Sequence, residues 1–147
     1  MVPHRSGSPP PSPDFAKREL PVETIPAGTR LSRIHHGDFD PLHFGSKTLD
    51  RFSDRRKIFG VCYLAMTIEG AFAETIVRGA RNGGIQQSYV QERSYSEIEA
   101  TAPLRLSSLH GPGLARVGAT SAVASGFYDA ARIWSRAIYD HPAALTE

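Results

Sequence analysis

The chain has little of what would cross-link a protein or hold it in a membrane. Cys62 is its single cysteine, which excludes a disulfide within the chain. The cysteine lies in an apolar run, where a buried, inert thiol is the first interpretation and a nucleophile the second. No apolar stretch approaches the roughly 20 residues of a membrane span, and the N-terminus lacks the apolar core of a secretory signal. We therefore expect a cytoplasmic protein without membrane contact.

The chain also lacks a large excess of either positive or negative charge. Lys and Arg number 17 against 15 Asp and Glu, which leaves a formal net charge of +2 at pH 7. The arginines are scattered along the chain, whereas a nucleic-acid-binding protein carries a clustered basic face. The sequence therefore predicts no direct contact with nucleic acid.

The common metal and phosphate signatures are also missing. His35 and His36 are neighbours in a predicted strand, so their side chains point to opposite faces, and neither an HExxH nor a CxxC spacing occurs. The glycine-rich residues 79–84 lack the Lys-Ser/Thr ending of a P-loop, and no GxSxG elbow of a serine hydrolase is present. We expect no metal site and no resident cofactor.

At 147 residues the chain is long enough for one domain with a real core. Residues 1–22 are rich in Pro and Ser and lack apolar periodicity, which predicts disorder. Residues 23–147 then form the folded domain.

The remaining chain alternates between strand and helix patterns, which predicts a mixed α+β fold. The continuous apolar run 57–65 predicts a strand covered on both faces. Thr67 is a suitable N-cap for the helix that follows it. Further strands are predicted at 27–37, 85–92, 102–109 and 114–120, and a last helix, capped by Ser125, at 126–140.

Four polar residues stand in apolar surroundings: Arg33, Arg51, Tyr63 and Glu74. Each has a structural explanation. Arg33 would lie on an exposed strand face and Arg51 in an ordinary loop, while Tyr63 would bury its ring and bond its hydroxyl to the backbone. Glu74 would pair with Arg78 one helical turn later.

Together with their neighbours, these residues form a recognisable pattern. TRLSRIHH at 29–36, LDRFSD at 49–54 and FGVCYLAMTIEGAFAETIVR at 59–78 resemble the RES domain family of bacterial toxins, and the likeness extends over about residues 28–142. The resemblance implies an ADP-ribosyltransferase-like fold, with a split β-sheet core and flanking helices. It implies NAD as the substrate, consumed by hydrolysis or phosphorolysis, and an Xre-type antitoxin as the partner protein; a homodimer stays open.

The resemblance also assigns roles to the four residues. Glu74 and Arg33 match the catalytic positions, and Tyr63, Arg51 and Arg33 match positions that bind NAD. A carboxylate can stabilise the oxocarbenium-like ribose left when nicotinamide departs, an aromatic ring can stack on nicotinamide, and guanidinium groups suit a pyrophosphate.

The sequence departs from the family at two places. The segment that carries the family's named serine is not recognisable before the chain stops, so we expect a C-terminally truncated RES domain. Ser32 stands where many members have an aromatic residue. Two alternatives to an NAD-degrading toxin therefore remain: an inactive remnant that only binds antitoxin, and an ADP-ribosyltransferase acting on a protein.

Overall fold

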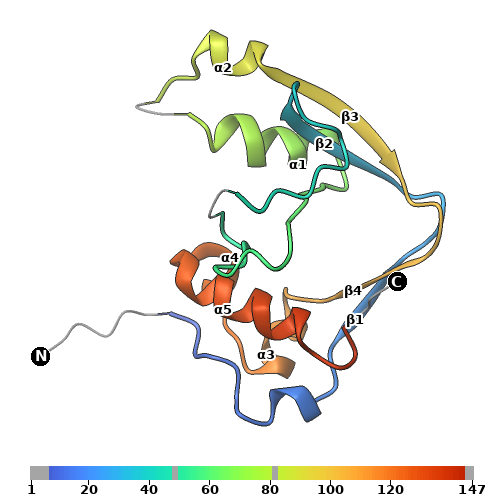
Figure 1. Cartoon of the computed structure of the whole chain (residues 1–147), viewed down its shortest axis with the longest axis vertical. Coiled ribbons are helices and arrows are strands. Elements are labelled where there is room, and N and C mark those ends of the chain that lie inside the picture. The colour runs from blue at the N-terminus through green and yellow to red at the C-terminus, as the bar shows by residue number, and fades with distance from the viewer. Residues whose placement is uncertain (1–6, 48–49, 81–82, 145–147) are drawn as a thin grey trace, which may run out of the picture. The chain divides into compact units, whose positions relative to one another are not determined.

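The computed structural model describes residues 7–47, 50–80 and 83–144, and it mixes short strands with short helices, as the sequence predicts (Figure 1). Strand β1 pairs with β4, and β2 pairs with β3, so the strands form two separate two-stranded sheets. The strands are β1 (Val22–Ile25), β2 (Arg30–His36), β3 (Arg93–Glu99) and β4 (Leu104–Ser107). The helices are η1 (Phe15–Lys17), α1 (Ile68–Phe72), η2 (Ala73–Val77), α2 (Gln87–Gln91), α3 (Pro112–Val117), α4 (Ala122–Ser125) and α5 (Tyr128–Tyr139).

The chain divides into two compact units, each assembled from separated segments. Unit 1 contains Met1–Thr24, Gly45–Val61 and Arg105–Glu147. Unit 2 contains Ile25–Phe44 and Cys62–Leu104. The sequence predicts a single domain at residues 23–147, whereas the structure divides these residues between the two units. Unit 1 also includes the N-terminal segment.

Unit 1 is built around the apolar face of α5. Ala131 and Trp134 of this helix are buried, as their helical spacing predicts. Phe127 has the same apolar spacing, but it is the N-cap of the helix and is 69% exposed. Ser125 therefore does not cap α5; it ends the preceding short helix α4.

The N-terminal segment differs from the predicted disorder at the residues that pack on the core of unit 1. Phe15 lies in the 3-10 turn η1 and is only 5% exposed, and Leu20 is buried in the same core. The indole N–H of Trp134 donates a hydrogen bond to the carbonyl of Pro9, at 2.8 Å. The packing of Phe15 and Leu20 and the hydrogen bond to Pro9 attach this segment to the core of unit 1. Residues 1–6 lie outside the described part.

Unit 2 is organised by the pairing of β2 with β3. The strands are antiparallel, and their register runs from Arg30 opposite Glu99 to His36 opposite Arg93. The helix formed by α1 and η2 packs beside β2, and Thr67 caps it as predicted, since its hydroxyl accepts a hydrogen bond from the N–H of Gly70 at 3.1 Å.

Three predicted strands are wrong. The apolar run 57–65 makes only isolated bridges, at Val61 with Gly45 and at Ala65 with Ser32. Residues 85–92 contain helix α2, and Arg93–Glu99, with no strand predicted, forms β3. Residues 114–120 contain most of helix α3, which has Pro112 in its first turn and the left-handed Gly118 at its C-cap.

Candidate functional site

Arg33 lies on β2 and is half-buried, so the exposed strand face considered for it is wrong. Its guanidinium donates hydrogen bonds to the carbonyl oxygen of His43, at 3.2 Å from Nη1 and 3.1 Å from Nη2. It also donates to the carbonyl of Pro41 and, at 2.8 Å, to the sulfur of Cys62. Arg33 therefore fastens the loop after β2 to the segment that contains Tyr63.

Tyr63 follows Cys62 directly and is 39% exposed, so its ring is not enclosed by the core. Its segment is held beside β2 by a two-way backbone bridge. The N–H of Ser32 donates to the carbonyl of Ala65 at 2.7 Å, and the N–H of Ala65 donates back at 2.8 Å. The strand pairing that the sequence predicts here is thus reduced to one bridge, which still places the phenol segment along β2.

Glu74 lies in η2, a π-helical turn that continues α1. The turn is closed by a hydrogen bond from the N–H of Arg78 to the carbonyl of Ala73, at 3.2 Å. The carboxylate of Glu74 is 60% exposed and lies 2.9 Å from a guanidinium nitrogen of Arg78, so the predicted ion pair exists. Single π turns inside α-helices occur frequently at functional sites, and the sequence pattern gives no sign of this one.

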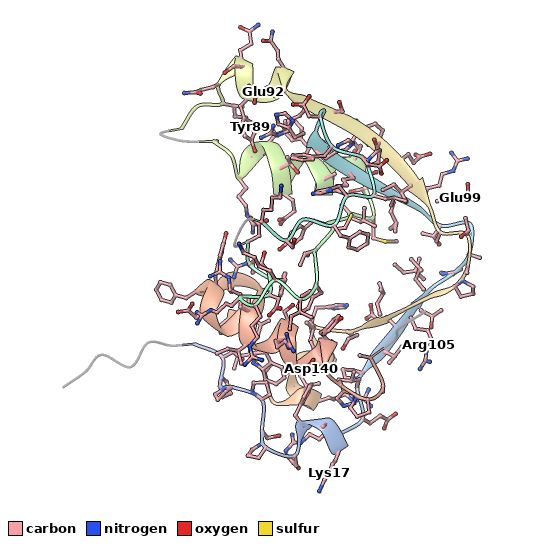
Figure 2. All side chains as sticks on the ribbon, in the orientation of Figure 1. Lys17, Tyr89, Glu92, Glu99, Arg105 and Asp140 are labelled. Atoms are coloured by element: carbon pink, nitrogen blue, oxygen red, sulfur yellow. The ribbon has the colours of Figure 1, made fainter. Side chains whose placement is uncertain are left out.

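Unit 2 carries three of the four candidate residues on segments that are bonded to one another. The hydroxyl of Thr75, next to Glu74, donates to the carbonyl of Ile34, next to Arg33, at 3.2 Å. Tyr89 of α2 adds a second support, since its hydroxyl donates to the carbonyl of Thr75 at 3.1 Å (Figure 2). β2, the Tyr63 segment and the π turn therefore form one bonded framework.

Arg51 belongs to unit 1, so unit 2 holds the other three without it. Its Nη1 donates to the carbonyl of Gly126 at 2.8 Å, and its guanidinium carbon lies 4.6 Å from the ring centroid of Tyr128. Its Nε is buried and has no hydrogen-bond partner among the described residues. A buried, unpaired donor is costly.

A second guanidinium, which the sequence analysis did not consider, faces the same ring. The guanidinium carbon of Arg132 lies 5.4 Å from the ring centroid of Tyr128, and its Nε donates to the carbonyl of Asp50 at 3.0 Å. Tyr128 and Arg132 are four residues apart on α5, a spacing that places both on one helix face. The i, i+4 spacing of Tyr128 and Arg132 is the sequence signal from which their contact could have been predicted.

Cys62 is a poor nucleophile in this structure. Burial raises the pKa of its thiol above its usual range, and the guanidinium of Arg33 offsets only part of that effect. The thiol is therefore protonated near neutral pH, and its contact with Arg33 is a structural one.

The described residues contain no group of three His, Cys, Asp or Glu side chains placed to hold a metal ion. Within the same residues, no helix is long and apolar enough to cross a membrane.

Residues 30–146 match the sequence pattern of the RES domain. The chain belongs to the RES domain family. No curated protein and no solved structure matches the chain. The RES match includes Arg33, Arg51, Tyr63 and Glu74 and draws on both units.

Proposed function

We propose that this RES domain cleaves the bond between nicotinamide and ribose in NAD, as the toxin of a type II toxin–antitoxin system. The observation that carries the proposal is the exposed carboxylate of Glu74 on a π-helical turn, bonded into the same framework as Arg33 and Tyr63. Family membership supplies the context, and an Xre-type antitoxin is the proposed partner.

The chemistry suits a single carboxylate. When the ribose–nicotinamide bond breaks, its electron pair leaves with nicotinamide, which departs neutral and needs no general acid. The positive charge then lies on the ribose, where a nearby carboxylate stabilises it. Attack by water gives ADP-ribose and a proton, and attack by phosphate gives ADP-ribose phosphorylated at the same carbon.

Glu74 can be released for this role at little cost. Its pairing with Arg78 is an exposed i, i+4 contact, with side-chain exposures of 60% and 49%. Such helix pairs contribute only about 0.3–0.5 kcal/mol. A ribose hydroxyl that donates to the carboxylate would therefore replace this interaction easily.

The remaining candidates supply binding contacts. Tyr63 is 39% exposed and offers its ring to nicotinamide. Arg33 keeps Nε and one Nη2 hydrogen uncommitted among the described residues. These two donors are proposed to hold the pyrophosphate through charge-assisted hydrogen bonds. Arg51 lies in unit 1, and its role in binding NAD stays a prediction.

The test is nicotinamide release from NAD, with and without phosphate, for the wild type, Glu74→Gln and Glu69→Gln. Glu69 is a matched control, because it is an exposed glutamate on α1. We expect Glu74→Gln to lower the rate by about 10²–10³-fold, the usual loss when one group that stabilises transition-state charge is removed. The control should match the wild type.

Equal rates for Glu74→Gln and the wild type would refute the assignment of Glu74. No nicotinamide release by the wild type would refute the enzymatic function and favour a protein that only binds antitoxin. Label from adenine-labelled NAD that becomes attached to protein in a lysate would indicate ADP-ribosyl transfer instead.

A further inference from the structure

The loop after β2, residues 37–44, is held firmly although it has no regular structure. Asp40 fixes its turn, because its carboxylate accepts from the N–H of Leu42 at 2.8 Å and its carbonyl accepts from the N–H of His43 at 2.9 Å. Arg33 then fastens the loop through the carbonyl of His43, at 3.1 and 3.2 Å. The loop is therefore a rigid support for the side chains it carries.

This rigid loop presents its apolar side chains to solvent. Phe39 is 52% exposed although its ring stacks on that of His43, with centroids 4.8 Å apart and planes 16° from parallel. His36 meets the ring of Phe39 edge-on at 5.8 Å. Leu42 and Phe44 are 55% and 61% exposed. A loop whose only role was packing would bury these side chains, so exposure on an ordered support indicates a contact surface.

We propose that the stacked pair Phe39–His43 is a binding site for a planar heteroaromatic base, and that its ligand is the adenine of NAD. The identification of adenine rests on the proposed function. In that function Tyr63 takes nicotinamide, Glu74 takes the ribose and Arg33 takes pyrophosphate, which leaves adenine without a contact.

Two observations favour a base over another ligand. The nearly parallel Phe39–His43 stack is a flat aromatic surface, and every nucleobase has a face that can extend such a stack. The carboxylate of Asp38 is 87% exposed and lies 3.6 Å from Nδ1 of His36, whose ring meets Phe39, so it offers an acceptor for the exocyclic amino group of adenine. The guanidinium of Arg33, which is proposed to bind the pyrophosphate, donates a hydrogen bond to the carbonyl oxygen of His43. The proposed adenine site and the proposed pyrophosphate contact are therefore adjacent.

The test compares two halves of NAD. AMP contains adenine without nicotinamide, and nicotinamide mononucleotide contains nicotinamide without adenine. Ligand-observed NMR titrations would be recorded for the wild type, Phe39→Ala, Phe39→Trp and Leu42→Ala. Leu42 is the matched control, since it is an equally exposed side chain of the same loop.

We expect the adenine H2 and H8 resonances to shift upfield on binding, as protons over an aromatic ring do. Phe39→Ala should lower AMP affinity by about 5- to 150-fold, the range for loss of one base stacked on an aromatic side chain. It should leave nicotinamide mononucleotide unaffected. Phe39→Trp should restore AMP binding, and Leu42→Ala should not change it.

The site is refuted if the wild type does not bind AMP, if Phe39→Ala binds AMP normally, or if Leu42→Ala loses as much affinity as Phe39→Ala. Failure of the site and failure of the proposed function are separable. Glu74-dependent NAD cleavage with an unchanged KM in Phe39→Ala would refute the site alone. Phe39-dependent AMP binding without NAD cleavage would refute the function alone.

Discussion

Removal of the Phe15 ring tests whether the N-terminal segment belongs to the folded core. The ring is 5% exposed and meets Trp134 edge-on at 5.3 Å and His141 at 5.2 Å. Phe→Ala substitutions in cores cost about 3–5 kcal/mol, since burial and packing are lost together. At a slope of about 2 kcal/mol/M, the urea midpoint should fall by about 2 M.

Trp134 is the assay, because it is the single tryptophan of the chain and packs against the substituted ring. Its fluorescence therefore reports the unfolding of unit 1. Phe127→Ala is the matched control. That side chain is 69% exposed, and surface substitutions change the free energy of unfolding by about 0.5 kcal/mol or less. If Phe15→Ala lowered the midpoint no more than Phe127→Ala, docking of the N-terminal segment would be disproved.

Three further predictions concern single side chains. Burial opposes ionisation of Asp54, but the N–H groups and the Arg136 guanidinium that bind its carboxylate lower its pKa overall. The stabilisation is present above the ordinary pKa of an Asp and is lost as the pH falls through the lowered one. The urea midpoint of Asp54→Asn should therefore depend less on pH between about pH 5 and pH 2 than that of the wild type, and an unchanged profile would contradict this. Gly79→Ala should destabilise unit 2 by about 1–3 kcal/mol, because an added Cβ would lie 2.7 Å from the ring of Tyr89. Thermal unfolding followed by circular dichroism should show this loss of stability. The same substitution in a Tyr89→Ala background should cost less. The Cys62 thiol, whose pKa is raised by burial, should react slowly with a thiol reagent at pH 7 and fast in urea. Rapid labelling of the folded chain would argue against the burial of this thiol.

Local signals predicted the parts of the fold that depend on neighbouring residues. The Thr67 cap, the helix after it and the apolar spacing of α5 depend on contacts within one or two turns, so the sequence shows them. The register of β2 with β3 depends on partners that are distant in the chain, and seven residues of β3 were missed for that reason. The short apolar run 114–120 predicts a strand, but Pro112 in the first turn and Gly118 at the C-cap bound a helix there.

The candidate site was predictable as a set of residues but not as a geometry. The residue types of Arg33, Tyr63 and Glu74 identify the family, and the match to the RES domain confirms that identification. The π turn under Glu74 and the loop bonds of Arg33 could not be predicted, because each depends on the exact path of the backbone. The role of every site residue stays a prediction.

The interleaving of the two units has a consequence for synthesis on the ribosome. Unit 2 has all its segments once Leu104 has left the exit tunnel, so β2, β3 and the π turn can assemble while translation continues. Unit 1 must wait for α5, because Phe15 packs on Trp134 and His141 and Pro9 accepts a hydrogen bond from Trp134. During that interval Phe15 and Leu20 lack the core on which they pack, while the segments that bear Arg33, Tyr63 and Glu74 can already be folded.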